Sequence, residues 1–286
     1  SSDLAELSRQ VGRRGYDCAV VMVSSWKNAR LVGKAGIPIR IGPLVKWYAP
    51  FFFNRTMRQR RSLGARHEAA YNVDLLSPLG VTAPRELPPP LVTARKEAVA
   101  RAGSMLAETF GKPCARPLVI VHPGMGGSAL NWPEALWARL TGLLGREKGL
   151  SVLVTGSEGE LGMLERVAWA AAGESEERVK IKCGLPLEDY IALLSLASVV
   201  AAPSTGPLHL ASALGKPVVG IYSPVPAHHP KRWGPLGLGA KKVFLPHVDC
   251  PGALRCVEKS CPHFPCMESI KPEKVLEQIL VFLGGL

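Results

Sequence analysis

The residues with the clearest chemical potential lie in one strand–turn–helix segment. An apolar run over 199–202 precedes the polar turn Ser204, Thr205 and Gly206, and Pro207 then opens a helix. The first N–H groups of a helix have no partner within it, and together with the positive end of the dipole they bind phosphate. Gly206 lets a ligand approach the backbone, and the two hydroxyls suit ribose or phosphate oxygens. We therefore predict a nucleotide phosphate site at this turn.

A second glycine-rich loop follows another predicted strand, Leu118–His122. This loop reads PGMGGS over 123–128, and its three glycines allow positive φ and bring backbone N–H groups close to an anion. It matches neither the Walker loop nor the GxGxxG fingerprint. Two loops of this kind in one α/β protein strengthen the prediction that the chain binds a nucleotide.

The order and spacing of these motifs resemble glycosyltransferase family nine, the bacterial ADP-heptose:lipopolysaccharide heptosyltransferases. The motifs are HPGMGGS at 122–128 with NWP at 131–133, STGPLH at 204–209, KRWGP at 231–235 and HEAAYNVD at 67–74. The resemblance implies a GT-B fold, in which two Rossmann-like domains with parallel sheets enclose the ligand. It also implies inverting transfer of heptose from ADP-heptose to the lipopolysaccharide inner core. Neither a metal nor a cofactor besides the ADP-sugar donor is expected.

The resemblance assigns residues to the donor site. The matching positions are Met125, Gly126, Gly127, Ser128, Leu185 (against the adenine), Ser204, Thr205, Gly206 and His209. Ser204 stands where many members carry Asp, which alters one ribose or phosphate contact. A Lys of some members is replaced here by Leu130 or Asn131. We expect Lys231 or Arg232 to supply the missing positive charge.

Other polar and aromatic residues have two open interpretations. His122 either contacts the ligand or packs at the strand end. Glu158 and Glu160 either reach a ribose hydroxyl or complement the dipole of the following helix. Trp132 and Trp233 are predicted to pack in the interior rather than to bind ligand.

Alternating apolar runs and helical segments predict an α/β fold with parallel sheets. The stiff segment PRELPPP at 84–90 is the predicted linker. It separates a partial acceptor-side Rossmann-like domain over 1–91 from a nucleotide-sugar-binding Rossmann-like domain over 92–286.

The N-terminal domain is expected to be incomplete. Family members begin with a strand and a Gly-Asp loop that carries the proposed catalytic Asp, and this segment has no counterpart before Ser1. The catalytic base is therefore unassigned, with Asp17, His228 and His229 as candidates. We expect the chain to bind ADP without transferring sugar. The alternatives to a heptosyltransferase are an inactive fragment that binds ADP-sugar, or another GT-B activity such as a nucleotide-sugar epimerase.

Positive charge is concentrated near the N-terminus. Residues 1–66 contain thirteen Lys or Arg and three Asp or Glu, while the whole chain has a net charge of +12. Such a region attracts an acidic lipopolysaccharide core or an anionic membrane, although a merely solvated surface is the alternative. Nucleic acid is not an expected partner, since no recognised module is present and aromatics are 6% of the chain.

The cysteines point to a reducing compartment. Seven is an odd number, and no signal peptide or apolar run of ~20 residues is found. We expect a cytoplasmic protein, and peripheral contact with the inner membrane is a further expectation. The cluster Cys250, Cys256, Cys261 and Cys266 lacks a CxxC knuckle, so free thiols are expected and a zinc or iron–sulfur site is the alternative.

Overall fold

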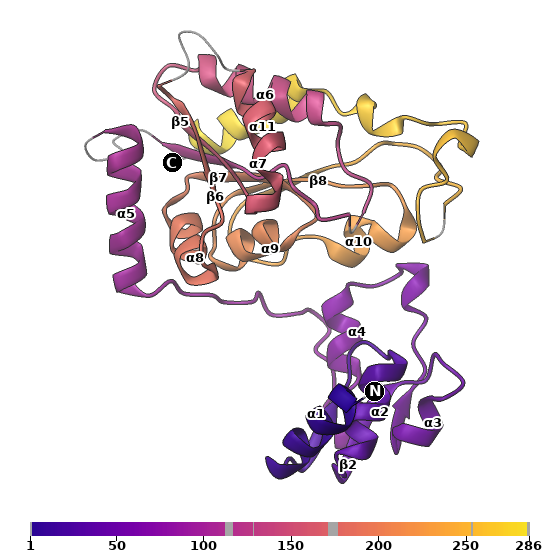
Figure 1. The fold of residues 1–286 in the computed structure, drawn as a ribbon. Helices are drawn as coiled ribbons and strands as arrows, with labels where there is room; N and C mark the ends of the chain where they lie inside the picture. Colours follow the sequence, from indigo (N-terminus) through magenta and orange to yellow (C-terminus); the bar gives the residue numbers. More distant parts are fainter. Residues whose placement is uncertain (1, 112–116, 128, 171–176, 253, 285–286) are drawn as a thin grey trace. The chain divides into compact units, whose positions relative to one another are not determined.

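The chain divides into two compact units, unit 1 (Ser1–Pro88) and unit 2 (Pro89–Leu286) (Figure 1). The computed structural model describes residues 2–111, 117–127, 129–170, 177–252 and 254–284. The division falls within the proline-rich segment at 84–90, whereas the sequence suggested a boundary after residue 91. The acceptor-side and donor-side roles of the two units stay predictions.

Unit 1 contains a parallel sheet in the order β1-β2-β3. Its strands are β1 (Cys18–Val20), β2 (Ile39–Pro43) and β3 (Arg55–Met57). Its helices are α1 (Ser2–Arg13), α2 (Trp26–Lys34), α3 (Ala49–Phe52), α4 (Glu68–Asp74) and the short 3-10 turns η1 (Arg61–Leu63) and η2 (Ser77–Leu79). A small core forms where α2 packs on the sheet and buries Ala29 and Val32 against Ile37 and Phe53. The apolar runs at 17–23 and 37–42 predict the first two strands, whereas β3 is short and largely exposed and was not predicted.

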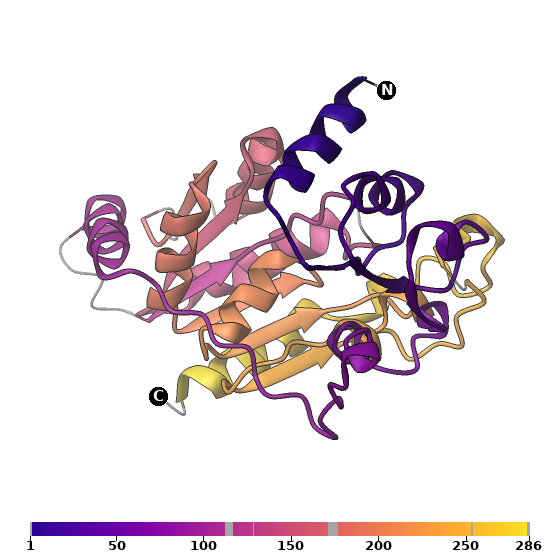
Figure 2. The same ribbon diagram turned by 90° about the horizontal axis from the view of Figure 1, so that it is seen from below.

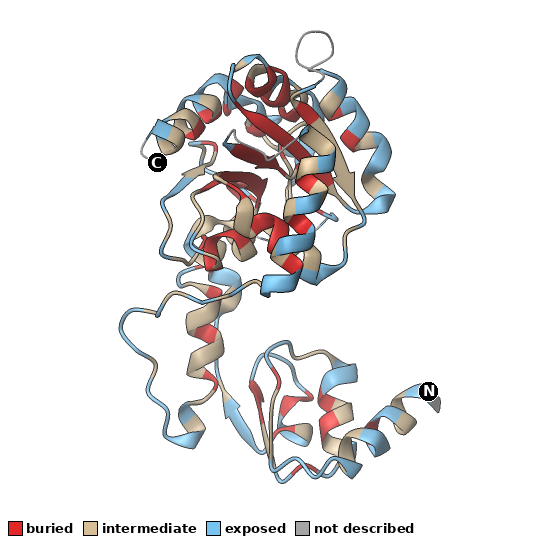
Figure 3. Ribbon diagram, turned by 90° about the vertical axis from the view of Figure 1, so that its left-hand side faces the viewer, coloured by how far each residue is buried: buried red, intermediate tan, exposed pale blue. Residues whose placement is uncertain are grey.

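Unit 2 is built on a six-stranded parallel sheet in the order β6-β5-β4-β7-β8-β9. The strands are β4 (Leu118–Val121), β5 (Ser151–Gly156), β6 (Val179–Cys183), β7 (Val199–Pro203), β8 (Val218–Ile221) and β9 (Lys241–Phe244). Apolar and β-branched residues fill the central strands, and β4, β7 and β8 are buried throughout (Figure 3). The predicted α/β class with parallel sheets is confirmed.

Helices cover both faces of this sheet (Figure 2). One face carries α6 (Glu134–Arg146), α7 (Leu161–Trp169) and α11 (Pro272–Gly284). The other carries α5 (Lys96–Phe110), α8 (Leu187–Leu196) and α9 (Gly206–Ala213). Along each strand, side chains therefore enter one or the other of two apolar clusters, which explains why these strands read as continuous apolar runs. Among the described helices, none is both long and apolar enough to span a membrane.

The strand order of this sheet reverses between β4 and β7, which form its topological switch point. From β4 the chain adds β5 and β6 on one side, and from β7 it adds β8 and β9 on the other. Open α/β sheets bind ligands at the carboxyl ends of the strands beside such a reversal, because the two following loops diverge there and leave a crevice. The loops in question begin at His122 and Ser204, so the fold brings together the two loops that the sequence singled out.

Candidate functional site

A cavity of about 470 Å³ opens at the start of α9, and we call it the α9 pocket. It is lined by Ala129, Ser204, Thr205, Gly206, His209, Ala227, His228, Arg232 and Trp233. The lining comes from the loop after β4, the β7–α9 turn and the segment with η4 (Pro226–His228) and α10 (Pro230–Trp233). Four of the predicted donor-site residues, those at 204–206 and 209, thus share one cavity with Arg232.

The backbone around Thr205 makes the α9 pocket suitable for an anion. Thr205 caps α9 in extended conformation, with φ −136° and ψ 169°, and Pro207 follows within the first turn. The Thr205 hydroxyl donates a hydrogen bond to the carbonyl of Pro203 at 3.3 Å, which holds the turn. Gly206 is exposed, and a β-carbon there would meet no atom within 4 Å. The helix N-terminus is therefore open to a ligand.

The second wall of the α9 pocket carries a positive charge on a fixed support. Trp233 donates its indole N–H to the carbonyl of Ala227 at 2.9 Å, and Tyr222 donates its hydroxyl to the carbonyl of Trp233 at 2.6 Å. The Arg232 guanidinium lies over the Trp233 ring, 5.1 Å from its centroid. Trp233 thus packs, as predicted, and also lines the cavity. The arrangement holds a guanidinium beside the helix N-terminus, where both attract phosphate.

His228 is the acid–base candidate that lines the α9 pocket. Its Nδ1 is buried and finds no hydrogen-bond partner within the described part of the chain. Burial lowers the pKa of His228, and the neighbouring Arg232 lowers it further. The imidazole is therefore neutral near pH 7 and is able to accept a proton or a hydrogen bond.

The structure distinguishes between the two predicted cations. Lys231 is exposed and does not line the α9 pocket, whereas its neighbour Arg232 does. Asn131, one of the two residues that the resemblance places at the family lysine, has a structural role. Its side-chain N–H donates to the carbonyl of Pro123 at 2.8 Å, and its Oδ1 accepts from the backbone N–H of Trp132 at 2.8 Å. Trp132 itself is buried against Trp137, which confirms that it packs in the interior.

The loop after β4 adopts the conformation that its glycines predict. Gly126 and Gly127 have φ of +56° and +71°, values that L side chains avoid. At Gly124, a β-carbon would collide with the carboxylate of Glu160, so any larger residue there would require that carboxylate to move. Met125 is buried, with 8% of its surface exposed. Ser128 lies outside the described residues, and its neighbour Ala129 reaches the α9 pocket.

A second cavity of about 490 Å³ lies at the carboxyl ends of β5 and β6, and we call it the His122 pocket. It is lined by His122, Gly156, Ser157, Glu158, Gly159, Lys182, Gly184, Leu185 and Tyr190. Leu185, which the resemblance places against an adenine, is therefore in this cavity and not in the α9 pocket. Glu158 lines it as well, whereas Glu160 accepts hydrogen bonds from the backbone N–H and hydroxyl of Ser157 in a capping box.

The wall of the His122 pocket contains a hydrogen-bonded cluster that the sequence did not reveal. His122 Nδ1, the Thr155 hydroxyl and the Tyr190 hydroxyl lie 3.0–3.1 Å from one another. Burial lowers the pKa of His122 to about 4, although the nearby Glu160 opposes this change. Burial also raises the pKa of Tyr190. All three groups are therefore neutral near pH 7. His122 directly follows β4, Thr155 lies in β5 and Tyr190 lies in α8, so no local sequence signal could have identified the cluster.

Glu160 brings a negative charge close to this cluster. Burial raises the pKa of its carboxyl, but the two hydrogen bonds from Ser157 and the proximity of His122 together outweigh burial and leave the pKa below its ordinary value. Glu160 is thus ionised near pH 7, and its Oε2 accepts both hydrogen bonds from Ser157.

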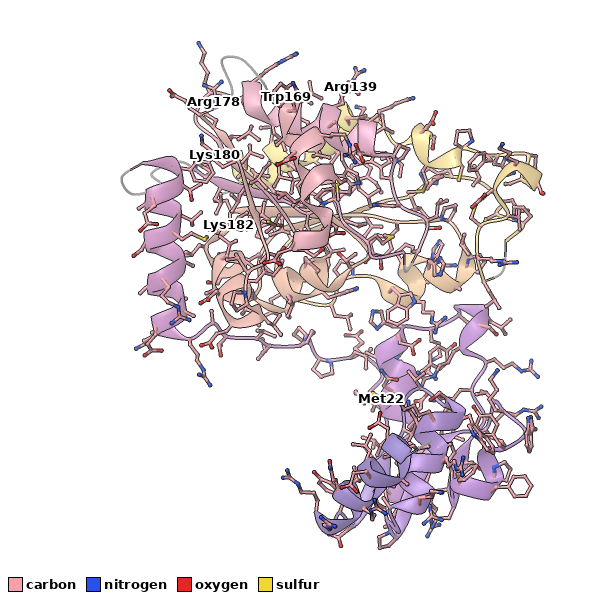
Figure 4. All side chains as sticks on the ribbon, viewed as in Figure 1. Met22, Arg139, Trp169, Arg178, Lys180 and Lys182 are labelled. Atoms are coloured by element: carbon pink, nitrogen blue, oxygen red, sulfur yellow. The ribbon has the colours of Figure 1, made fainter. Side chains whose placement is uncertain are left out.

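A row of cations leads along the edge strand to the same cavity. Arg178, Lys180 and Lys182 follow one another along β6 and the residue before it (Figure 4). Side chains two residues apart in a strand point to the same face, so the three share one face of the sheet edge. Lys182, the last of them, lines the His122 pocket.

The described residues offer no evident metal centre. Among them, no group of three His, Cys, Asp or Glu side chains is arranged to hold a metal ion. The six described cysteines are free thiols. In the 250–266 loop, Cys256 Sγ accepts a hydrogen bond from the backbone N–H of Glu258, and Cys261 Sγ accepts one from the backbone N–H of His263.

Comparison with known proteins identifies the family. Residues 4–263 match the family described as glycosyltransferase family 9 (heptosyltransferase). A Haemophilus influenzae protein, described only provisionally as a glycosyltransferase, is 32% identical over all of this chain and 80% of its own length. Lipopolysaccharide heptosyltransferase 2 of Salmonella typhimurium is 25% identical over 96% of this chain and 77% of its own.

Solved structures agree on the fold. Escherichia coli ADP-heptose heptosyltransferase II aligns with a TM-score of 0.77 at 21% identity, covering 99% of this chain and 81% of that one. An E. coli heptosyltransferase solved with ADP aligns with a TM-score of 0.66 at 19% identity, covering 98% of this chain and 77% of that one. These likenesses confirm the predicted GT-B type of fold. With the family match over most of its length, the chain is a member of glycosyltransferase family 9 and thus a glycosyltransferase.

Proposed function

We propose that this glycosyltransferase moves heptose from ADP-heptose to the inner core of lipopolysaccharide. The observation that carries the proposal is the α9 pocket, where Thr205, Gly206 and His209 at a helix N-terminus share a cavity with Arg232. A nucleoside diphosphate is the chemical group that such a combination of N–H donors and a guanidinium recognises.

The leaving group explains why this charge matters for the reaction. As the glycosidic bond breaks, the departing ADP gains negative charge on its terminal phosphate. Donors and cations that already point at that phosphate lower the barrier without reorganising. Arg232 is held in place by the Trp233 ring, and the N-terminal N–H groups of α9 are fixed by the helix itself.

The nucleoside is assigned to the His122 pocket. Leu185 offers an apolar contact for the base, and Lys182 and Glu158 are polar residues of the same lining. The loop after β4 begins at His122 and reaches the α9 pocket at Ala129, so it adjoins both cavities. The ADP bound to an E. coli heptosyltransferase of the same fold supports adenine as the base.

The identity of the donor sugar and of the acceptor is inferred from relatives of this chain. Heptosyltransferases from Salmonella typhimurium and E. coli match 96% and 97% of this chain. The acidic lipopolysaccharide core that the family resemblance implies as acceptor agrees with the net positive charge of residues 1–66. No general base is assigned, because among the described residues that line the α9 pocket there is no carboxylate; His228 is the neutral base candidate in that lining.

The test is a transfer assay with ADP-heptose and heptose-deficient lipopolysaccharide, read as ADP release and as the mass of the product. Heptose addition is expected, in contrast to the sequence-based expectation of ADP binding without transfer, because the family match and the heptosyltransferase relatives support activity. ADP is expected to bind more tightly than UDP in calorimetry. Tighter binding of UDP would exclude an ADP-sugar donor. ADP binding without transfer would favour a protein that only holds the nucleotide sugar. Reaction with a different ADP-sugar would support the assigned donor site but would show that the transferred sugar is not heptose.

A further inference from the structure

Unit 1 exposes large apolar side chains in the two loops that follow β1 and β2. After β2, Val45, Trp47 and Phe51 are exposed, Trp47 to 78% and Phe51 to 76%. After β1, Val23 is exposed to 69%, and Trp26 at the start of α2 is also exposed. Loops after neighbouring parallel strands lie at the same edge of a sheet. We call these five residues the aromatic patch.

Contacts between the rings join the two loops into one surface. The ring centroid of Trp26 lies 6.1 Å from that of Trp47, and the Trp47 centroid lies 6.3 Å from that of Phe51. The Tyr48 hydroxyl donates a hydrogen bond to the carbonyl of Ser24 at 2.9 Å, which ties the loop after β2 to the loop after β1. A contiguous exposed apolar surface of this kind is typical of an interaction site.

Positive charges surround the aromatic patch without neutralising partners. Lys27 and Lys46 are the sequence neighbours of Trp26 and Trp47, and Lys34 lies two helical turns beyond Trp26. Within the described residues these three lysines form no ion pair. Carboxylates are scarce nearby, since residues 1–66 contain thirteen Lys or Arg and three Asp or Glu.

We propose that the aromatic patch docks unit 1 onto the surface of an anionic lipid bilayer. Tryptophan is stable at the level of lipid headgroups, because its ring is apolar and its N–H stays hydrated. Lysines beside the rings gain from the negative surface potential of acidic lipids. Apolar insertion and charge attraction together give stable but reversible binding, which neither provides alone. The proposal does not depend on which sugar is transferred.

The test is co-sedimentation of the full chain with vesicles of phosphatidylcholine, with and without phosphatidylglycerol. Binding is expected only to the vesicles with phosphatidylglycerol, and it weakens at high salt. The double variant Trp47→Ser/Phe51→Ser lowers the partition coefficient by at least about tenfold, because both side chains lose their apolar contact. The double variant Lys27→Gln/Lys46→Gln also lowers it about tenfold.

Matched controls lie in unit 2. Trp169 is 79% exposed, so Trp169→Ser removes an equally exposed ring outside the aromatic patch. Lys148→Gln/Lys259→Gln removes two exposed lysines. Both controls are expected to bind vesicles as the unsubstituted chain does. All variants are expected to keep the circular dichroism spectrum and the urea unfolding transition of the unsubstituted chain, which report an intact fold. Absence of vesicle binding, equal binding without phosphatidylglycerol, or unchanged binding by Trp47→Ser/Phe51→Ser would overturn the proposal.

Discussion

The two pockets of unit 2 differ in how their polar groups are used. In the α9 pocket, a helix N-terminus faces the cavity, a guanidinium lies on a ring beside it, and the buried Nδ1 of His228 has no partner among the described residues. In the His122 pocket, the polar side chains of His122, Thr155 and Tyr190 are bonded to one another.

This difference predicts two kinds of binding. A negatively charged ligand group binds most tightly where hydrogen-bond donors and a positive charge are directed at it. Substitutions in the α9 pocket should therefore change ligand affinity strongly. Where the polar groups already satisfy each other, the cavity binds mainly by shape, and substitutions should change stability more than affinity. Substitutions in the two pockets therefore separate effects on ligand affinity from effects on stability.

The largest effect is expected from a negative charge at the start of α9. Gly206→Asp places a carboxylate where we assign the diphosphate, and the open space there accommodates the side chain. Two unit charges about 5 Å apart repel by about 3 kcal/mol at an effective dielectric constant of about 20. ADP affinity should fall by about a hundredfold relative to Gly206→Asn, which has the same size without the charge. Equal affinities of the two variants, measured by calorimetry, would remove the diphosphate from this helix end.

His122 should make the stability of the fold depend on pH. Its pKa is about 4 in the folded chain and about 6.5 when exposed. The contribution of the neutral buried imidazole is therefore complete above pH 6.5 and is lost as the pH falls from 6.5 to 4. The difference of about 2.5 pH units corresponds to about 3 kcal/mol in the free energy of unfolding.

Urea unfolding at a series of pH values measures this dependence. His122→Gln should flatten the curve between pH 6.5 and pH 4, whereas His263→Gln, which changes an exposed histidine, should not. The same pH dependence in the His122→Gln chain would mean that another group titrates.

Arg232 and Lys231 provide a matched pair of neighbouring cations. Arg232→Gln should weaken ADP binding by about tenfold to a hundredfold, since a hydrogen bond to a charged group contributes about 1.5–3 kcal/mol. Lys231→Gln should change it less than about twofold, because Lys231 is exposed outside the α9 pocket. The reverse order in a calorimetric titration would assign the phosphate-binding cation to Lys231.

The smallest effect is expected at Tyr190. Tyr190→Phe removes one hydroxyl from the cluster with His122 and Thr155, which should cost about 1 kcal/mol of stability. ADP affinity should change less than about threefold. A loss of more than about tenfold in affinity with an intact fold would show that the hydroxyl binds the ligand.

Local patterns in the sequence were sufficient to predict the β7–α9 turn but not the His122 cluster. The β7–α9 turn is a continuous segment, so its apolar run, glycine and proline predict both the conformation and the chemistry. The cluster depends instead on the sheet order, which places β5 beside β4, and on the packing of α8. Residues 33 and 68 positions from His122 meet it there, and no local periodicity encodes that contact.

The edge strands β3 and β9 were missed for a related reason, whereas the edge strands β1 and β6 were predicted. β9 reads KKVF, in which two exposed lysines precede two half-buried residues, and it pairs with β8 alone. A strand with one neighbour needs little apolar surface, so its sequence resembles a loop. The family resemblance supplied most of the donor-site residues, while the structure distinguished Arg232 from Lys231 and separated Leu185 from the α9 pocket.

A crystal structure of the full chain with ADP tests the central claim most directly. We expect the diphosphate to lie within hydrogen-bond distance of the first N–H groups of α9 and of Arg232, and the adenine to lie against Leu185 in the His122 pocket. A diphosphate bound away from α9, or an adenine in the α9 pocket, would contradict it.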